Sequence, residues 1–467
     1  MGGSKIPFVY AGACWLSCRL CDLGSRRASG VGYRYHPGTA QSIRERGHCR
    51  VYSVSMMAKK KILLVTPVFP MPETGCDQAD RAGGMRELVR LGYEVTVISK
   101  IGEYADRGYL KSAAESLGIR LITVPYKYSQ RGISRWRRIV NHLGKLRNPL
   151  YLDGAAYEYA EREIQHVYAQ EFARVQPDIA WFDYSYLWPL YHVARKAGVP
   201  IVTRSLNFEP THFLEEEGHT LINYLKYIPK LLSEIITVWQ STLILALSPY
   251  EASVYRRWGA RRIIVLPLRG LPPLIRDDHE IRHGSPLHVF FMGSGYSVAH
   301  NERGLDMVSG AMAKRAQREC PGAFVFHISG ARIPSKYLPR FNGTTIINEG
   351  YIDADTFDAY MDSMDIALSP TPKWVGMQQK VYEPLCRGIP LITPRCNLGD
   401  YPFVDGQHYM AAETEDEYFA ALLTLRDAHL RATLSHNSIT SARALFTWEE
   451  NERILKEGME KYLDMIH

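Results

Sequence analysis

The feature that most constrains this chain's fold is the regular alternation of short apolar runs with helix-like stretches from residue 60 onward. The run KILLVTPVF at 61–69 is mostly apolar and is bounded by Pro67 and Pro70, which is typical of a strand buried in a parallel sheet. The helical pattern ADRAGGMRELVRLGY at 79–93 follows, and then the strand-like EVTVIS at 94–99. The unit recurs as far as residue 270. Strands that alternate with helices predict a parallel, doubly wound sheet of the α/β class.

A break and a second series divide the chain into two such domains. The stretch RGLPPLIRDDHEIRHGSPL is rich in proline and charge and shows no periodicity, so it predicts a linker. A new strand–helix alternation begins at HVFFMGS. The sequence predicts an N-terminal Rossmann-like domain at 56–270, a linker at 271–285, a C-terminal Rossmann-like domain at 286–445, and a terminal helix at 446–467 that packs back on the first domain. Two such domains predict a cleft at the carboxyl ends of their strands.

Residues 1–55 differ from the rest of the chain. They carry eight Lys and Arg against two Asp and Glu, whereas the other 412 residues are nearly balanced in charge. A body of balanced charge does not predict a nucleic-acid footprint. Two methionines, Met56 and Met57, stand directly before the first basic and apolar run. We interpret 1–55 as a poorly ordered leader or upstream read-through, with the natural start at one of these methionines.

The leader also holds a cysteine pattern, CWLSCRLC, in which Cys14, Cys18 and Cys21 have the spacing of the cluster loop in radical-SAM iron–sulfur enzymes. Such a loop follows the first strand of a β/α barrel, and no helix or strand period follows it here. We favour chance spacing, with a small metal site that adds Cys49 as the alternative. An iron–sulfur enzyme would be brown, and colourless protein would exclude it.

Cysteine content and hydropathy indicate the cellular compartment and whether the chain crosses a membrane. Eight cysteines in 467 residues are too few for a disulfide scaffold, which predicts a reducing, cytoplasmic setting. The best apolar segment, IITVWQSTLILAL at 235–247, is shorter than a membrane span and contains Gln240, so it predicts a buried helix or strand.

Four segments carry a resemblance to a known family. They are VFFMGSGYSVAHNERGL, INEGYIDADTFDAYMDSMDIALSP, GMQQKVYEPLCRGIPLITP and ARALFTWEENERIL. Together with the two-domain layout, they resemble the GT-B glycosyltransferases, and specifically the retaining enzymes of glycosyltransferase family 4, over residues 57–467. The third segment matches the family's Gly, Lys-x-x-Glu and Gly-x-Pro positions, which here are Gly376, Lys380, Glu383, Gly388 and Pro390.

The residues of that segment suit the chemistry which the resemblance implies. QKVYEPLCRG predicts a short helix after a Gly-containing turn, and the free N–H groups at its start suit a pyrophosphate. Lys380 adds a point charge, and Glu383 is expected to accept hydrogen bonds from ribose hydroxyls. The plain alternative is a solvated i, i+3 pair. One departure is Val375, which stands where many family members have a carboxylate that contacts the sugar.

Further donor-side candidates follow other strands of the C-terminal domain. Gly293 and Ser294 form a glycine-rich turn that allows close approach to a phosphate, or that is simply a tight turn. Asn301 stands in a region where family members often carry a basic pair. Arg332 is a phosphate candidate or a surface arginine, and Tyr351 lies where family members hold the base.

Two aspartates in the same domain form an Asp-x-Asp pair, Asp353 and Asp355, which resembles a metal–nucleotide motif of another glycosyltransferase fold. We interpret Asp355 instead as a helix N-cap. A GT-B enzyme needs no metal here, because the helix end and Lys380 neutralise the leaving phosphate. We therefore expect no metal and no cofactor apart from the nucleotide-sugar substrate.

In the N-terminal domain, the stretch at 66–84 is predicted to be a long loop over the cleft. Its candidates are Gly75, Arg81, Gly83 and Gly84, with mobility and helix capping as the plain alternative.

The acceptor-side catalytic candidates follow two strands of this domain. Asp183 ends the strand DIAWFD, and RSLNFEPTH resembles an Arg/His-x-x-Asn-x-Glu motif of related transferases. That motif supplies Arg204, Asn207, Glu209 and His212, for which a structural role is the alternative.

The basic, partly apolar stretch at 129–151 suits an anionic membrane surface, with a solvated basic helix as the alternative. A second amphipathic stretch, FLEEEGHTLINYLKYIPKLL at 213–232, belongs to the same domain.

The resemblance therefore implies a hexosyltransferase-like enzyme that moves a sugar from a nucleotide-diphosphate donor to a glycan or lipid-linked hydroxyl, with retention. Such an enzyme suits polysaccharide or cell-envelope biosynthesis, in the cytoplasm or on the cytoplasmic face of a membrane. The alternatives are a sugar-nucleotide epimerase of the same fold and a non-catalytic nucleotide-sugar-binding protein.

Overall fold

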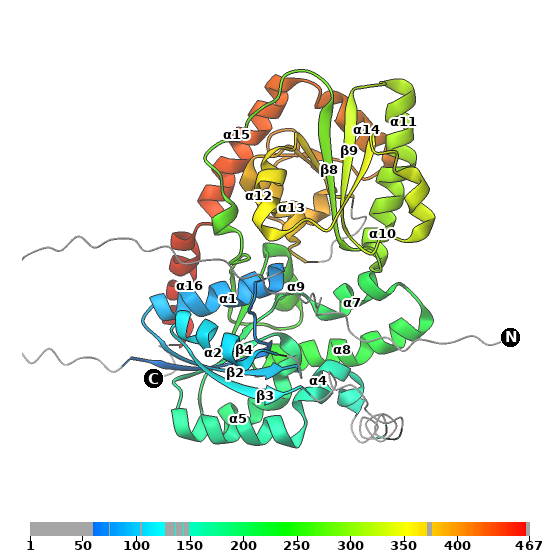
Figure 1. The fold of residues 1–467 in the computed structure, drawn as a ribbon. Helices are drawn as coiled ribbons and strands as arrows, with labels where there is room; N and C mark the ends of the chain where they lie inside the picture. The colour runs from blue at the N-terminus through cyan, green and yellow to red at the C-terminus, as the bar shows by residue number, and fades with distance from the viewer. Residues whose placement is uncertain are drawn as a thin grey trace, which may run out of the picture. The chain divides into compact units, whose positions relative to one another are not determined.

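The computed structural model describes residues 59–73, 75–102, 105–126, 149–370 and 376–463, together with Trp136 and Leu143. Contacts group residues 58–467 into one compact unit. Within it, two parallel sheets of seven and six strands each carry helices, as Figure 1 shows. We call the parts built on these sheets the N-lobe and the C-lobe.

The N-lobe sheet has the strand order β3-β2-β1-β4-β5-β6-β7, and every pairing in it is parallel. From β1 the chain first builds the sheet outward through β2 and β3, and then returns to the other side of β1 with β4. The carboxyl ends of β1 and β4 therefore flank the switch point where such folds bind ligands. The strands are β1 Lys61–Val68, β2 Glu94–Ile101, β3 Arg120–Pro125, β4 Ile179–Asp183, β5 Ile201–Arg204, β6 Leu243–Ala246 and β7 Ile263–Val265. The helices are α1 Cys76–Arg90, α2 Arg107–Ser116, α4 Gly154–Tyr159, α5 Arg162–Val175, α6 Tyr191–Lys196, α7 Glu209–Glu217, α8 Leu221–Gln240 and α9 Pro249–Arg257.

The C-lobe sheet repeats the pattern in the order β10-β9-β8-β11-β12-β13, again all parallel. Its switch point lies beside β8. The strands are β8 Leu287–Gly295, β9 Phe324–Ala331, β10 Ile346–Gly350, β11 Ile366–Leu368, β12 Leu391–Thr393 and β13 Met410–Ala411. The helices are α10 Ala299–Asp306, α11 Ala313–Glu319, α12 Ala354–Asp362, α13 Gln379–Arg387, α14 Glu415–Thr424, α15 Ala428–Leu445 and α16 Trp448–Leu463.

The C-terminal helix α16 returns to the N-lobe, as the fold class requires. Its apolar side chains Leu455, Met459 and Leu463 belong to the same buried cluster as Ile62 and Leu64 of β1. The GT-B expectation of two Rossmann-like domains with a returning helix is confirmed.

The apolar runs became strands because both faces of each sheet are covered. Ile62, Leu63, Leu64 and Val65 of β1 are all at most 2% exposed, which leaves no alternation of inward and outward positions. The segment 235–247, which the sequence predicts to be either a buried helix or a buried strand, is divided at Ser241. Its first part ends α8, and its second part is β6, a central strand between β5 and β7.

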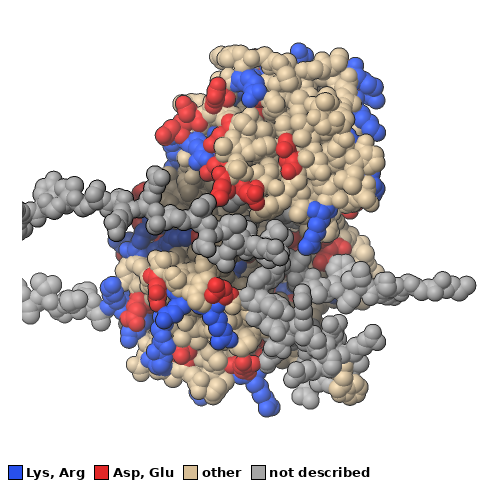
Figure 2. All heavy atoms as spheres, in the orientation of Figure 1, with Lys and Arg blue, Asp and Glu red and all other residues tan. Residues whose placement is uncertain are grey.

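Several sequence predictions fall on residues outside this description. They are the whole leader at 1–55 with its cysteines, most of the basic stretch at 129–151, and Val375. On the face seen in Figure 2, Lys and Arg are intermixed with Asp and Glu, as the balanced charge of the body predicts. Among the described residues, no helix is both long and apolar enough to cross a membrane, and no group of His, Cys, Asp and Glu side chains is arranged to hold a metal ion.

Candidate active site

Helix α13 begins where the sequence places it, directly after a turn at Gly376. The backbone there has a φ of +83°, which favours glycine. Gln378 is the N-cap residue, yet its side chain makes no capping hydrogen bond, and its buried Oε1 has no partner among the described residues. The first turn thus has no side-chain cap from Gln378, although the Gln379 N–H interacts with the Cys76 thiol and the Val381 N–H donates to the Gln378 carbonyl at 3.0 Å. The positive end of the helix dipole still suits an anion.

Lys380, in the first turn of α13, reaches the start of α10. Its Nζ donates to Asn301 Oδ1 at 2.8 Å, and Asn301 Nδ2 donates to the carbonyl of Gly295 at the end of β8 at 3.0 Å. Burial lowers the pKa of Lys380 to about 8. A cation that has lost much of its hydration and has a single neutral partner is poised for an anionic ligand.

His300 lies beside this lysine and was not predicted from the sequence. It is 9% exposed, and its Nδ1 has no hydrogen-bond partner within the described parts of the chain. Burial, reinforced by the charge of Lys380, lowers its pKa to about 3, so the imidazole is neutral and can donate from one nitrogen. The only sequence signal was its position, one residue before the predicted Asn301.

The two lobes meet around this cluster. A Cβ on Gly376 would stand 2.1 Å from Asn207 Oδ1 of the N-lobe, so glycine is required for this approach as well as for the turn. Arg303 of α10 lies 3.6 Å from Glu215 of α7. Leu206 and Leu247 of the N-lobe share a buried cluster with Met377 of the C-lobe. The sequence-predicted Asn207 and Gly376 are therefore neighbours in space.

On the N-lobe side, Asp183 ends β4, and the guanidinium of Arg81, from α1, donates to the Val68 carbonyl at the carboxyl end of β1. Asp183 Oδ1 accepts from Trp181 Nε1 at 3.0 Å, and its buried Oδ2 has no hydrogen-bond partner in the described chain. Burial raises the pKa of Asp183, although Arg269 and Arg81 oppose that rise. Arg81 donates to Thr66 Oγ1 at 3.0 Å and stands 5.9 Å from the ring centre of Tyr184.

Glu209 and His212 stand in the first turns of α7. Burial raises the pKa of the Glu209 carboxyl, against the charges of Lys230 and His212. Burial lowers the pKa of His212, but the hydrogen bond and charge of Glu216, 3.2 Å away, more than offset it and raise that pKa overall. The pair offers a carboxyl and an imidazole on one helix turn, which suits proton handling near an acceptor hydroxyl.

Glu383 is placed differently from the sequence expectation. The side chain is 1% exposed and accepts from Gln379 Nε2 at 2.9 Å and from Arg387 Nε at 2.9 Å. Arg387 also binds Asp358 and Asp362, so Glu383 belongs to an ion network inside the C-lobe. The Glu383 oxygen that would bind a ribose hydroxyl is occupied by the hydrogen bond from Gln379. The ribose role of Glu383 therefore stays a prediction.

Arg204 does not face open space, contrary to the expectation for an acceptor-side residue. It is fully buried, pairs with Asp80 at 2.8 Å, and donates to the carbonyls of Leu266 and Pro267. Arg269 binds the same carboxylate at 3.1 Å. Burial opposes ionisation of Asp80, but the two arginines more than offset this and hold its pKa well below the ordinary value. We assign Arg204 to the N-lobe core, because a substrate cannot reach it here.

The predicted long loop at 66–84 is shorter than expected, because α1 begins at Cys76. Gly75 is its N-cap, and the other three candidates lie inside the helix. A Cβ on Gly84 would fall 1.9 Å from the Arg269 guanidinium, and one on Gly83 would fall 2.9 Å from the Arg269 carbonyl. These two glycines admit Arg269 to the buried network, so they do not form a cleft loop.

The remaining C-lobe candidates divide between packing and surface. A Cβ on Gly293 would meet the Tyr296 ring at 2.6 Å, which gives the glycine a packing role. Ser294 belongs to β8, and its side chain is outside the description. Arg332 is exposed with a φ of +61°, and Tyr351 is 60% exposed after β10. Nothing brings either side chain to Lys380.

The N-cap prediction for the Asp-x-Asp pair is wrong by two residues. Asp353 is the N-cap of α12, without a side-chain cap bond, and Asp355 stands in the first turn. An acidic residue in the first turn is still favoured by the helix dipole, which explains the pattern without a metal.

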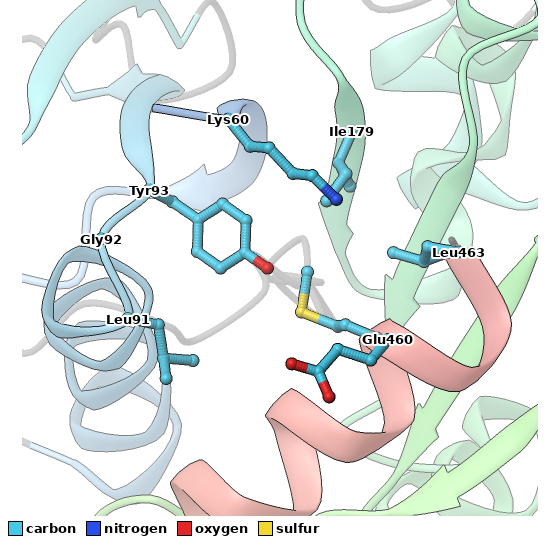
Figure 3. Close-up of a pocket in the computed structure, with 8 residues that line it drawn as sticks. Lys60, Leu91, Gly92, Tyr93, Ile179, Glu460 and Leu463 are labelled. Atoms are coloured by element: carbon cyan, nitrogen blue, oxygen red, sulfur yellow. The ribbon is translucent and has the colours of Figure 1, made fainter. Parts of the chain in front are cut away.

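A shallow pocket of the N-lobe is lined by residues that do not belong to this cluster. Figure 3 shows its lining, with Lys60, Tyr93 and Glu460 around a cavity of about 220 Å³. Lys60 precedes β1, and Ile179 begins β4, so the pocket sits at the amino ends of the strands. Parallel α/β folds bind ligands at the opposite ends, where the Lys380 cluster lies.

Comparison with solved structures identifies the fold as that of GT-B glycosyltransferases. Sucrose-phosphate synthase from Thermosynechococcus elongatus has a TM-score of 0.61 at 12% identity, over 87% of this chain and 100% of that one. HepE from Anabaena, in complex with UDP and glucose, has a TM-score of 0.56 at 13% identity, over 86% and 100%. A mutant of S. aureus TarM, in complex with UDP and two saccharide ligands, has a TM-score of 0.57 at 9% identity, over 87% and 100%.

The likeness is one of fold. The chain matches no protein-family model, and a search of curated proteins finds no match. The specific assignment to family 4 therefore stays a prediction, as do the substrates.

Proposed function

We propose that the protein is a glycosyltransferase that moves a sugar from a nucleoside-diphosphate sugar to a hydroxyl acceptor, with retention of the anomeric configuration. The observation that carries the proposal is the start of α13, where Lys380 and the positive end of a helix without a side-chain cap lie together at the carboxyl edge of the C-lobe sheet.

A diphosphate fits this place for electrostatic reasons. Its two negative charges would meet the positive end of α13 and the ammonium of Lys380, which has one neutral partner at 2.8 Å. The charge that develops on the leaving phosphate as the sugar–oxygen bond breaks is stabilised by the same groups, so binding and catalysis share one site. Neutral His300 supplies a hydrogen-bond donor beside them.

The acceptor is proposed to lie against the N-lobe, near Asp183, Asn207 and Glu209. Its hydroxyl oxygen forms the new bond to the anomeric carbon while the bond to the donor phosphate breaks. The hydroxyl proton passes to the departing phosphate oxygen, which lies on the same side of the sugar in a retaining reaction. Burial raises the pKa values of the Asp183 and Glu209 carboxyls, and both side chains are proposed to form hydrogen bonds with the hydroxyls of the acceptor or the sugar.

The solved structures suggest which base to test first. HepE and TarM were each captured with UDP, so a uridine diphosphate sugar is the first donor we propose for this chain. The proposed acceptor is a hydroxyl of a glycan or a lipid-linked molecule, and the proposed biological role is cell-envelope synthesis.

The test is release of nucleoside diphosphate from UDP-, GDP-, ADP- and dTDP-sugars by the full chain, with product configuration read by NMR. The proposal expects one base to be preferred, and a product of unchanged anomeric configuration. An epimeric nucleotide sugar without nucleotide release would identify an epimerase. Donor binding without any turnover would identify a binding protein and refute the transferase.

A further inference from the structure

Helix α8 exposes a row of apolar side chains and buries most of its polar ones, although Val238 and part of Leu231 pack against the N-lobe core. An ordinary surface helix buries its apolar face instead. The buried positions include Asn223, Lys230, Ser233, Glu234 and Thr237. Each is held by a named partner. Ser233 Oγ donates to Asp153 at 2.9 Å, Thr237 Oγ1 donates to the carbonyl of Ser185 at 2.7 Å, and Ser185 Oγ donates to Glu234 at 2.7 Å.

These bonds fix the rotation of the helix. Turning α8 to bury its apolar side would break all of them and leave the carboxylates of Asp153 and Glu234 unpaired inside the N-lobe, a cost of several kcal/mol. The outward orientation of the apolar side is therefore the stable one for the isolated chain.

The exposed side forms one continuous stripe. Leu221, Leu225, Ile228, Leu232 and Trp239 follow each other at intervals of three, four or seven residues, which places them within a narrow arc of the helix. Leu221 is 79% exposed, Leu225 63% and Trp239 74%. A stripe that runs the whole 20-residue helix is about 30 Å long and is the signature of a docking surface.

The exposed charge on α8 and the composition of the sequence before Pro149 favour an anionic partner. Within α8, Lys226 is exposed, and the one acidic residue, Glu234, is buried. By sequence, residues 127–148 carry seven Lys and Arg and no Asp or Glu. The described chain resumes at Pro149–Leu152, which packs against α8. An indole at the end of an apolar stripe is typical of helices that lie at a lipid interface.

We propose that α8 lies flat on an anionic lipid bilayer, with the stripe Leu221, Leu225, Ile228, Leu232 and Trp239 in the headgroup–acyl boundary. In Figure 1, α8 runs along the N-lobe beside α7 and α4. The surface is interfacial, since no described helix is suited to cross the membrane. This proposal does not depend on the transferase chemistry, because lipid binding needs no donor.

The same helix supports the acceptor side of the candidate site. Glu234 on its buried face accepts the backbone N–H of Glu209 at 3.1 Å and the hydroxyl of Ser185. Ser185 lies two residues after Asp183. A bilayer under α8 would therefore bring a membrane-anchored hydroxyl acceptor next to the residues proposed to receive it.

The test is flotation of the full chain with vesicles of phosphatidylcholine and phosphatidylglycerol in equal parts, against vesicles of phosphatidylcholine alone. The Leu225→Ser/Ile228→Ser variant is expected to lower partition by about 10-fold or more for each side chain replaced, because each loses its apolar burial. Lys226→Gln is expected to lower binding about 5-fold on the anionic vesicles alone.

The matched control is Leu338→Ser/Leu423→Ser, which removes two exposed leucines of the C-lobe, 48% and 39% exposed, and should leave partition unchanged. Thermal midpoints of both double variants should match the parent, since all four side chains are exposed. Failure of the parent to float with anionic vesicles overturns the proposal. So does a dimer in sedimentation that the α8 variant abolishes, which would assign the stripe to a second copy of the chain.

Discussion

The strongest consequence of the site geometry is the effect of replacing Lys380 by methionine. The substitution removes the ammonium that is proposed to contact the diphosphate and keeps a similar apolar volume. A hydrogen bond to a charged group contributes about 1.5–3 kcal/mol, so the affinity for a nucleoside diphosphate should fall about 10- to 150-fold. Among the described residues, Asn301 is the one side-chain hydrogen-bond partner of Lys380, and burial disfavours the lysine's charge. The variant should therefore be at least as stable as the parent.

Titration calorimetry with UDP, together with thermal unfolding of both proteins, separates these two effects. Lys314→Met, at an exposed lysine of the same lobe, is the matched control and should change neither quantity. Unchanged affinity in Lys380→Met would refute the reasoning, and a loss of stability would mean that the lysine is structural.

The pKa of about 8 adds a pH signature to the same experiment. The charged form of Lys380 binds the diphosphate, so affinity should hold below pH 8 and fall above it by up to about 10-fold per pH unit. In Lys380→Met this fall should disappear. A parent whose affinity is flat between pH 7 and 10 would contradict the assignment.

Three further outcomes are expected. Gly376→Ala forces a Cβ into a φ of +83° and to within 2.1 Å of Asn207, so unfolding in urea should show a loss of about 1–2 kcal/mol, with weaker donor binding in calorimetry. Asp80→Asn leaves two buried arginines without their carboxylate and should cost about 3–5 kcal/mol in the same urea assay, or prevent folding. Burial raises the pKa of Glu87 from 4.5 to about 7, so the folded state keeps its proton longer than the unfolded chain, and stability falls as pH rises through that window. Glu87→Gln should flatten this fall, and an unchanged slope would contradict it.

Much of the fold was readable from local pattern. Apolar runs such as 61–69 are stable in the middle of a parallel sheet, so their pattern predicts buried strands. The helix at 379–387 is predicted by the glycine turn before it and by Gly388 after it, which adopts the left-handed conformation. The boundary of α1 was less readable, because Gly83 and Gly84 suggest a loop. Only the packing of Arg269 against them explains two adjacent glycines inside a helix.

The site was predicted in part, since its components meet through contacts far apart in the sequence. Lys380 and Asn301 were both candidates, but their hydrogen bond spans 79 positions. The sequence predicts Arg204 to be a cleft residue, because its pairing with Asp80, 124 positions away, cannot be read from local pattern. In the structure this pairing holds Arg204 in the core. For α8 the sequence shows an amphipathic helix, and only the partners of its polar side reveal that the apolar side faces outward.

The measurement that tests the central claim most directly is a crystal structure of the full chain with a nucleoside-diphosphate sugar, using the base that calorimetry selects. The proposed function predicts the diphosphate at the start of α13, within hydrogen-bond distance of Lys380 Nζ, with the sugar directed toward Asn207 and Glu209. A diphosphate bound elsewhere, for example in the pocket beside Lys60 and Tyr93, would contradict it.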